Sequence, residues 1–597
     1  MKKQLKYSSL ILLLLVLIVS CAKVVAPTGG EKDTSPPEIV KSSPENFSVN
    51  FTDKKIIITF DEYIQLKNVN QELLTSPPHN EKPEIKLRGK SLVINIKDTL
   101  EQDVTYNLNF NNAIADNNES NILKNYQYIF STGNIIDTLF IVGHLYNAFN
   151  LDFEEETFVM LYKNYNDSTP YKKIPDYVAK TDEEGAFFLN NLCSGSYRIF
   201  ALKDANSNYL FDQPSEAIAF LDTLLVPKVE IIEVFDTVKV KVPEDTVFVD
   251  SVVKSEKLIS SLEDIHLFLF QEDYQKQYLV SSSREKKGNC TFIFNKPLDK
   301  ELIVNPVNFT IPESEEWKII EKSITNDTIN YWITDSLIYK TDTLIFEIKY
   351  NKKDSIGNYI LTADTINLIF TEKEKIKSKK GKKDKEEKIT KVPSELSLSF
   401  NIKNQGNLDL NKNLQLIFNY PISDYDTSLI NLYFIEDTIE TLIKYDVFPD
   451  TVNFRKFSLS FPYEEASRYK LIVDSNAFKD IYNNINDSLA LIFTTRSIED
   501  YGIILLSIEN CPSPSYLLLL DEKENILRKI AFSNKTEIKY LLPKKYVLKI
   551  IHDKNNNDKW DTGNYLKNIQ PEKVYYYEQE IIIKENWDIE IIWDVEE

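Results

Sequence analysis

Two short polar segments of the sequence, DANSNYLFD and DKNNNDKWD, place oxygen-bearing side chains at the same four positions. Positions 1, 3, 5 and 9 are Asp204, Asn206, Asn208 and Asp212 in one segment and Asp553, Asn555, Asn557 and Asp561 in the other. Calcium takes six to eight oxygen ligands, which loops of this type supply from positions 1, 3, 5, 7 and 9. The spacing therefore makes both segments candidate calcium sites.

Three departures from a calcium loop favour a second interpretation, in which the Asp and Asn side chains close a tight turn on their own backbone. Position 6 holds Tyr209 or Asp558 instead of glycine, and position 12 holds Ser215 or Asn564 instead of glutamate. Glu216 lies one place too late. Both interpretations stay open, both roles are structural, and no cofactor beyond such a structural Ca²⁺ is expected.

Other residues that could perform chemistry do not form a recognisable group. The four histidines, His79, His144, His266 and His552, fall in different predicted domains, and none has a His or Cys partner at metal-ligand spacing. Nucleophile-elbow, zinc-protease and phosphate-loop motifs are absent from the sequence. No catalytic residue is assigned, and the sequence predicts a protein that is not an enzyme.

The N-terminal segment predicts export and lipid attachment. Three lysines precede an apolar run from Leu10 to Val19, which is too short to be a stable membrane-spanning helix. Ile18-Val19-Ser20-Cys21 resembles a bacterial lipobox. That resemblance implies a signal peptide at residues 1–20, acyl chains on Cys21 and a tether over residues 21–35. Because no Asp follows the cysteine, we expect an outer-membrane lipoprotein, on either the periplasmic face or the cell surface.

Composition indicates a β-rich chain of several domains. The 597 residues include 33 Tyr and 33 Phe, and short β-branched runs alternate with Asn, Asp, Ser and Pro clusters. The formal net charge of −21 argues against a nucleic-acid partner, because nothing would neutralise the phosphates.

Three stretches share a pattern of an opening strand, a strand followed by a polar loop, and a closing strand. The opening strands are IIITFDEYI, CTFIFNKPL and LQLIFNYPI, and the closing strands are YIFST, LIFTE and LIFTT. Alternating strands at this spacing predict β-sandwiches of roughly 100 residues. The stretches resemble bacterial Ig-like domains of the S-layer-protein type, which implies Ig-like domains at residues 36–135, 263–372 and 392–496.

A second kind of unit follows the first and the third of these domains. The segment from Thr181 to Phe200 resembles a prealbumin-like, carboxypeptidase-regulatory sandwich, with its T-D-x-x-G-x-F and L-x-x-G-x-Y strands. A looser copy near the C-terminus has Pro543 in place of the second glycine. The units cover residues 136–230 and 497–597, so the two polar loops lie at equivalent places in a duplicated domain.

The complete prediction is an all-β, elongated modular chain of tandem Ig-like and prealbumin-like β-sandwiches. Residues 231–262 form an extended linker, and the almost wholly charged residues 373–391 form a second linker. The segments PTGGEKDTSPP and FDEYIQLKN near the N-terminus, together with the C-terminal tail that begins DKNNNDKWDTGNYLKN, resemble a family of Ig-like-domain lipoproteins from the Bacteroidota. This resemblance extends over most of the chain. We expect a structural or interaction module of the cell envelope. The alternative is a glycan- or protein-binding accessory of an outer-membrane uptake, secretion or assembly complex.

Overall fold

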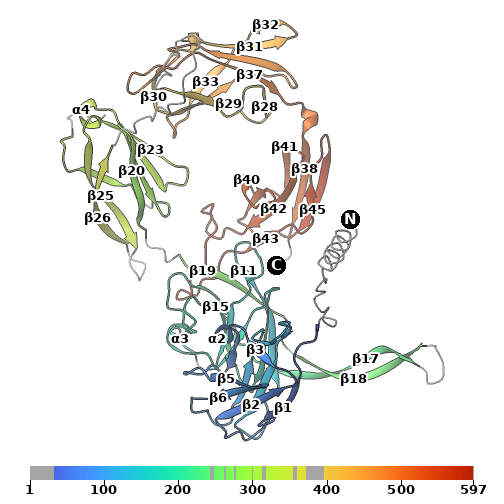
Figure 1. Ribbon diagram of the computed structural model, residues 1–597. Helices are drawn as coiled ribbons and strands as arrows, with labels where there is room; N and C mark the ends of the chain where they lie inside the picture. The colour runs from blue at the N-terminus through green and yellow to red at the C-terminus, as the bar shows by residue number, and fades with distance from the viewer. Residues whose placement is uncertain are drawn as a thin grey trace, which may run out of the picture. The chain divides into compact units, whose positions relative to one another are not determined.

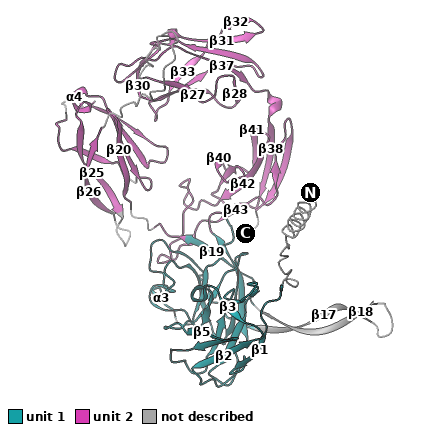
Figure 2. Cartoon of the chain, viewed as in Figure 1, with its two compact units in different colours: residues 1–147, 151–270 teal, residues 148–150, 271–597 magenta. Residues whose placement is uncertain are grey.

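The computed structural model describes residues 33–595, with gaps at residues 164, 242–247, 261, 263, 274–276, 299, 312–316, 354–358 and 371–395. Cys21, the signal peptide and the charged linker at 373–391 lie outside the described residues. The chain groups into two compact units, residues 1–147 with 151–270 and residues 148–150 with 271–597 (Figure 2). Regular structure is almost entirely β-sheet (Figure 1), which confirms the all-β prediction. No described helix is long and apolar enough to cross a bilayer.

The first sandwich packs a four-stranded sheet, β1-β2-β6-β5, against the sheet β10-β7-β4, with a small sheet β3-β8-β9 at one end. Alternation along β2 explains its core: Ile56, Ile58 and Phe60 point inward and are almost fully buried. The elements are β1 (Ile39–Ser43), β2 (Lys55–Phe60), β3 (Ile64–Leu66), α2 (Val69–Glu72), β4 (Leu74–Ser76), β5 (Glu84–Arg88), β6 (Ser91–Asn95), β7 (Thr105–Asn109), β8 (Ile114–Asp116), β9 (Ile122–Leu123) and β10 (Gln127–Ser131).

The second sandwich has the strand order β13-β12-β15-β16-β19-β11-β14. Its elements are β11 (Leu139–Asn147), β12 (Phe158–Tyr162), α3 (Thr169–Lys172), β13 (Tyr177–Lys180), β14 (Ala186–Leu192), β15 (Arg198–Lys203), β16 (Ala217–Phe220) and β19 (Ile265–Gln271). Between β16 and β19 the chain forms an antiparallel hairpin of β17 (Val229–Lys241) and β18 (Phe248–Ser260). The predicted linker at 231–262 is therefore mostly a hairpin, because its alternating halves pair with each other.

The third sandwich repeats the arrangement of the first with fewer strands, in the sheets β20-β21-β24-β23 and β22-β25-β26. Its elements are β20 (Leu279–Lys286), β21 (Asn289–Phe294), β22 (Ile303–Pro306), β23 (Lys318–Lys322), β24 (Thr328–Ile333), α4 (Ser336–Tyr339), β25 (Thr343–Lys353) and β26 (Tyr359–Ile369). By its predicted boundary at residue 263, this domain would include β19. The structure instead pairs it with β11 in the second sandwich, so that part of the predicted boundary at residue 263 is wrong.

The fourth sandwich contains the sheets β27-β29-β34-β33 and β28-β37-β35-β31-β32, with the pair β30-β36 at one end. Its strands are β27 (Leu398–Phe400), β28 (Gly406–Leu408), β29 (Leu414–Phe418), β30 (Ile422–Tyr425), β31 (Ile430–Glu436), β32 (Ile439–Leu442), β33 (Asp446–Pro449), β34 (Lys456–Ser460), β35 (Arg468–Val473), β36 (Phe478–Asp480) and β37 (Leu489–Thr495). The first, third and fourth sandwiches share the order of their four-stranded sheets, as expected for repeats of one domain.

The fifth sandwich duplicates the second. In both, the first strand pairs antiparallel with the fourth and parallel with the last, as β11 does with β14 and β19 and β38 does with β41 and β45. The strands are β38 (Gly502–Glu509), β39 (Tyr516–Leu520), β40 (Ile526–Ala531), β41 (Lys535–Leu541), β42 (Lys545–Ile551), β43 (Val574–Tyr576), β44 (Ile581–Ile582) and β45 (Asp588–Asp594). The two sandwiches therefore share their strand pairing, in which β19 corresponds to β45.

Candidate functional site

The first polar loop joins β15 to β16 and closes on its own first aspartate. Asp204 Oδ1 accepts the backbone N–H groups of Asn206 and Ser207 at 3.0 and 2.7 Å, and Oδ2 accepts that of Tyr209 at 2.7 Å. Ser207 and Tyr209 have left-handed φ angles of 59° and 61°. The backbone therefore makes, without glycine, the turn for which glycine is the usual residue.

The second loop, between β42 and β43, has the same design. Asp553 Oδ1 accepts the N–H of Asn557 at 3.0 Å, and Oδ2 accepts that of Asp558 at 2.7 Å. The left-handed residues again occupy positions 4 and 6, with φ of 56° at Asn556 and 63° at Asp558. The two loops are thus alike in backbone conformation as well as in sequence.

The asparagines at positions 3 and 5 donate their Nδ2 hydrogens to the carboxylate at position 9. Asn206 and Asn208 donate to Asp212, and Asn555 and Asn557 donate to Asp561. In this arrangement the amides present N–H groups, not oxygens, to the position-9 carboxylate. These are the contacts of the turn interpretation, and calcium binding stays a prediction.

A glutamate completes each loop. From the sequence, Glu216 was noted only as lying one place too late for a calcium ligand, and Glu572 was not included. Glu216 is 1% exposed and Glu572 is 5% exposed. Each accepts the N–H of the residue after the first aspartate and the N–H of the position-9 aspartate, at 2.8 to 3.2 Å. Burial raises the pKa of Glu572, and the charges of Asp561 and Asp553 raise it further. The two glutamates lie at different distances along the chain from their loops, so no fixed spacing identified them.

A group of metal-ligand residues that the sequence did not predict lies in the second sandwich. His144 Nδ1 is 2.7 Å from Asp264 Oδ2, and His266 Nε2 is 3.4 Å from the same oxygen. Among the described residues, this is the one group of three His, Cys, Asp or Glu side chains whose ligand atoms all lie within 4.8 Å of one another. The expectation that the histidines are scattered singly is therefore wrong for His144 and His266.

Strand pairing brings the three residues together. β11 and β19 run parallel, and His144 is the direct partner of His266. Because side chains alternate across a strand, Asp264, two residues before His266, lies on the same face. Gly143 permits this approach: a Cβ on it would lie 2.2 Å from the carbonyl oxygen of Ile265.

Aromatic rings surround the histidine pair on the outer face of the sheet. Tyr146 lies edge-on to His266 with ring centroids 5.5 Å apart, and it also contacts Phe153 and Phe268. Burial raises the pKa of Tyr146, and the negative charge of Asp264 adds to that effect. The triad thus combines a polar, partly exposed centre with an apolar wall.

A cleft of about 660 Å³ lies between the first and second sandwiches, inside one compact unit, and His144 and Asp264 form part of its lining. Most of its other polar groups are side-chain amides, from Asn107, Asn109, Asn111, Asn112, Asn125, Gln127 and Asn190. Asn107 donates to Gln127 Oε1 and Asn190 Oδ1, each at 2.9 Å, while its own buried Oδ1 has no partner. The half-exposed ring of Phe188 also lines this cleft.

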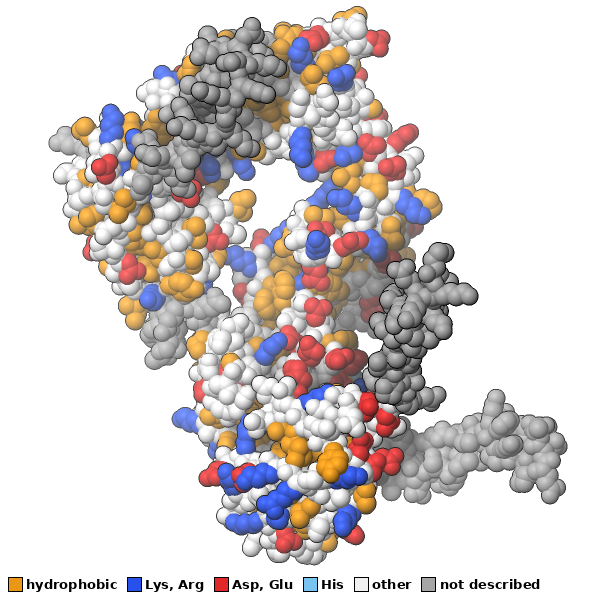
Figure 3. Space-filling view, in the orientation of Figure 1, with side chains coloured by type: hydrophobic (Ala, Val, Ile, Leu, Met, Phe, Trp, Pro, Cys, Tyr) orange, Lys and Arg blue, Asp and Glu red, His pale blue; other side chains and the backbone are white. Residues whose placement is uncertain are grey.

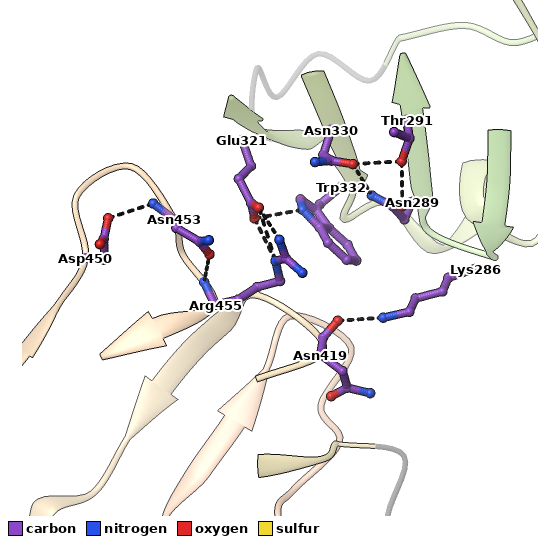
Figure 4. Close-up of polar contacts among 10 residues, drawn as sticks. All are labelled: Lys286, Asn289, Thr291, Glu321, Asn330, Trp332, Asn419, Asp450, Asn453 and Arg455. Atoms are coloured by element: carbon purple, nitrogen blue, oxygen red, sulfur yellow. Dashed lines mark hydrogen bonds and ion pairs between the residues drawn. The ribbon is translucent and has the colours of Figure 1, made fainter. Parts of the chain in front are cut away.

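A polar junction joins the third and fourth sandwiches within the other unit (Figure 4). Arg455 Nε donates to both oxygens of Glu321, at 3.1 and 3.0 Å, and Trp332 Nε1 donates to Oε2 at 3.2 Å. Lys286 Nζ donates to the carbonyl oxygen of Asn419 at 2.6 Å. Burial lowers the pKa of Lys286, and the positive charge of Arg455 lowers it further.

Aromatic residues extend the same junction. Tyr482, next to β36, lies edge-on to Tyr339 and Tyr420 with ring centroids 5.2 and 5.6 Å apart. A Cβ on Gly288 would lie 1.8 Å from the Tyr482 hydroxyl oxygen, so a larger residue at this position would force the Tyr482 side chain to move. Charged and aromatic contacts together hold these two sandwiches against each other.

Comparison with known families identifies the first domain. Residues 33–132 match the family of bacterial Ig-like domains. The match spans β1 to β10 and confirms the Ig-like prediction for this part of the chain. No curated protein matches the sequence.

Several solved structures share low similarity with the chain. A crystal structure of the S-layer protein rSbsC(31-844) is 11% identical, with 91% of this chain and 67% of that chain covered and a TM-score of 0.13. Titin A168169 is 13% identical, with coverages of 37% and 100% and a TM-score of 0.13. Native alpha-2-macroglobulin from Escherichia coli, domains MG0-NIE-MG1, is 13% identical, with coverages of 46% and 94% and a TM-score of 0.17.

Proposed function

We propose that this protein is a non-enzymatic outer-membrane lipoprotein of the Bacteroidota that acts as a structural or interaction module of the cell envelope. The observation that carries the proposal is the tandem arrangement of sandwiches, each built around its own cluster of buried apolar side chains. A chain of domains that each have their own hydrophobic core can hold binding surfaces apart and present them to partner molecules. The junction of Glu321 with Arg455 supports this role, because it keeps two neighbouring modules in one arrangement.

The membrane anchor in this proposal is the acylated Cys21. Multiple acyl chains on one residue anchor a protein stably, since each buried CH₂ contributes roughly 0.8 kcal/mol. Growth with an alkyne-tagged palmitate should label the wild-type protein and should not label Cys21→Ala. Cys193→Ala, which leaves the lipobox intact, is the matched control and should be labelled normally. Labelling of Cys21→Ala would contradict the proposal that Cys21 carries the acyl chains.

Partners are tested by purifying the tagged, lipidated protein from mild detergent and identifying co-purifying proteins by mass spectrometry. On the face drawn in Figure 3, acidic and basic side chains are intermixed, which suits local docking rather than capture by one broad charged field. A reproducible outer-membrane partner is the expected result. Recovery of the protein alone, in repeated preparations, would favour a free-standing spacer and would count against an interaction role.

The amide-lined cleft favours glycan binding as a second candidate function. Side-chain amides offer both hydrogen-bond donors and acceptors, as sugar hydroxyls require, and Phe188 provides an exposed ring that a sugar face can cover. Screening the full chain on a glycan array, followed by calorimetry, tests this function. Phe188→Ala should abolish binding, whereas Phe448→Ala, which removes a similarly exposed ring from β33, should not. Equal binding by both variants would exclude the cleft as the glycan-binding site.

A further inference from the structure

We propose that His144, Asp264 and His266 bind a divalent first-row transition-metal ion of the Zn²⁺ class. The donor set is two imidazole nitrogens and one carboxylate oxygen, on atoms that already lie within 4.8 Å of one another. Imidazole nitrogen suits zinc and its neighbours in the first row, whereas calcium and magnesium take oxygen ligands. The site is therefore distinct in chemistry from the two polar loops, whose Asp and Asn side chains could coordinate an ion only through oxygen atoms.

The distances between donor atoms fit a small ion. Ligands at 2.0–2.2 Å from a tetrahedral zinc lie about 3.3–3.6 Å from each other. Asp264 Oδ2 and His266 Nε2 are already 3.4 Å apart. His144 Nδ1 and Asp264 Oδ2 are 2.7 Å apart and need to separate by only about 0.6 Å to reach the short end of that range. Because these side chains are 33–53% exposed, rotamer adjustments suffice.

The backbone holds the donors in place from the buried side of the sheet. Leu145 and Leu267, the partners next to the histidine pair, point into the core and are 0% and 1% exposed. This packing fixes the register of β11 against β19 and so places His144 opposite His266. The two histidines lie on packed strands and therefore need little ordering when an ion binds.

The fold itself does not require these residues. The fifth sandwich contains the same parallel pair, β38 with β45, and neither strand contains a histidine. Its outward-facing partners are of other types, such as Leu505 with Glu590. A purely structural explanation for the histidine pair would predict a comparable polar group in both copies.

The surroundings leave room for further ligands. His144 and Asp264 line the cleft, so water or a donor group from a bound molecule can complete the coordination of the ion. Tyr146, Phe153 and Phe268 shield the other side. The bound ion would join residues 120 positions apart in sequence and would fasten β19 to β11 beyond the β17–β18 hairpin.

The first test is Zn²⁺ titration of the full chain, carrying a histidine-free affinity tag, in competition with a chromogenic chelator. One equivalent should bind. Loss of an outer-shell partner already weakens metal affinity about 10- to 100-fold, so His144→Gln, Asp264→Asn and His266→Gln should each weaken it by about 100-fold or more. His552→Gln, in the other compact unit, is the matched control and should bind like the wild type. Unchanged affinity in the triad variants would overturn the proposal.

A second measurement reads the ligands directly in the wild-type chain. Electron paramagnetic resonance of the wild-type chain loaded with one equivalent of Cu²⁺ should show coupling to two imidazole nitrogens, since copper shares these ligand preferences. His266→Gln should show coupling to one. A spectrum with oxygen ligands alone, or no binding of either metal at micromolar concentrations, would refute the site.

Discussion

The junction between the third and fourth sandwiches provides the sharpest test of how the modules are held. The Glu321 side chain is 4% exposed and that of Arg455 is 30% exposed. Arg455→Leu removes the guanidinium that satisfies both carboxylate oxygens of Glu321. It leaves the buried carboxylate with the Trp332 N–H as its remaining side-chain donor.

The magnitude follows from burial. Removing one partner of a buried ion pair costs about 3–5 kcal/mol, because the other charge stays buried without compensation. Arg455 is partly exposed, so water replaces some of its contacts, and we expect a loss of about 2–3 kcal/mol. With a denaturant slope of about 2 kcal/mol per M urea for such a domain, the unfolding midpoint should fall by roughly 1 M.

Trp332 provides a local probe for this experiment. The full chain has five tryptophans, and labelling with 5-fluorotryptophan gives each a ¹⁹F resonance. The resonance that is lost in Trp332→Phe is that of Trp332, which lies at the junction. Urea titration of that resonance reports the stability of the junction. The double variant Glu321→Leu/Arg455→Leu should recover most of the loss, because replacing both partners with apolar groups removes the unpaired charge. A midpoint unchanged in Arg455→Leu, or a double variant no better than the single one, would refute the reasoning.

Three further predictions follow from individual residues. Gly143→Ala should both lower the melting temperature and weaken Zn²⁺ binding, because the new Cβ collides with the Ile265 carbonyl and pushes β11 away from β19. A variant in which only one of these two quantities changes would contradict this explanation. Burial lowers the pKa of His79, despite the opposing charge of Asp98, so the unfolded chain binds more protons and stability should fall as pH drops below about 6.5. His79→Gln should flatten this dependence in urea titrations at pH 5 to 7. Burial raises the pKa of the Cys290 thiol to about 12, so iodoacetamide at pH 8 should spare it in the folded protein and alkylate it in urea.

Much of the sandwich architecture could be predicted because strands with one buried face carry a period-two pattern. The run that became β2 alternates buried and partly exposed side chains along its length, as its sequence indicated. The pairing of β11 with β19 could not be predicted in this way. Parallel pairing between segments about 120 residues apart leaves no local pattern. The β17–β18 hairpin is inserted before β19, so the predicted end of the second domain at residue 230 came too early.

Comparison of the second and fifth sandwiches distinguishes the features that both copies share from those present in one copy alone. Both copies retain the polar loop with its left-handed positions and its buried glutamate, Glu216 or Glu572, bound to the same two backbone groups. Features common to both copies are explained by closing the same turn. The histidine pair occurs in one copy alone, on strands whose counterparts pack without it. His144 and His266 are therefore better explained by a ligand than by the demands of the fold, and metal titration distinguishes the two explanations.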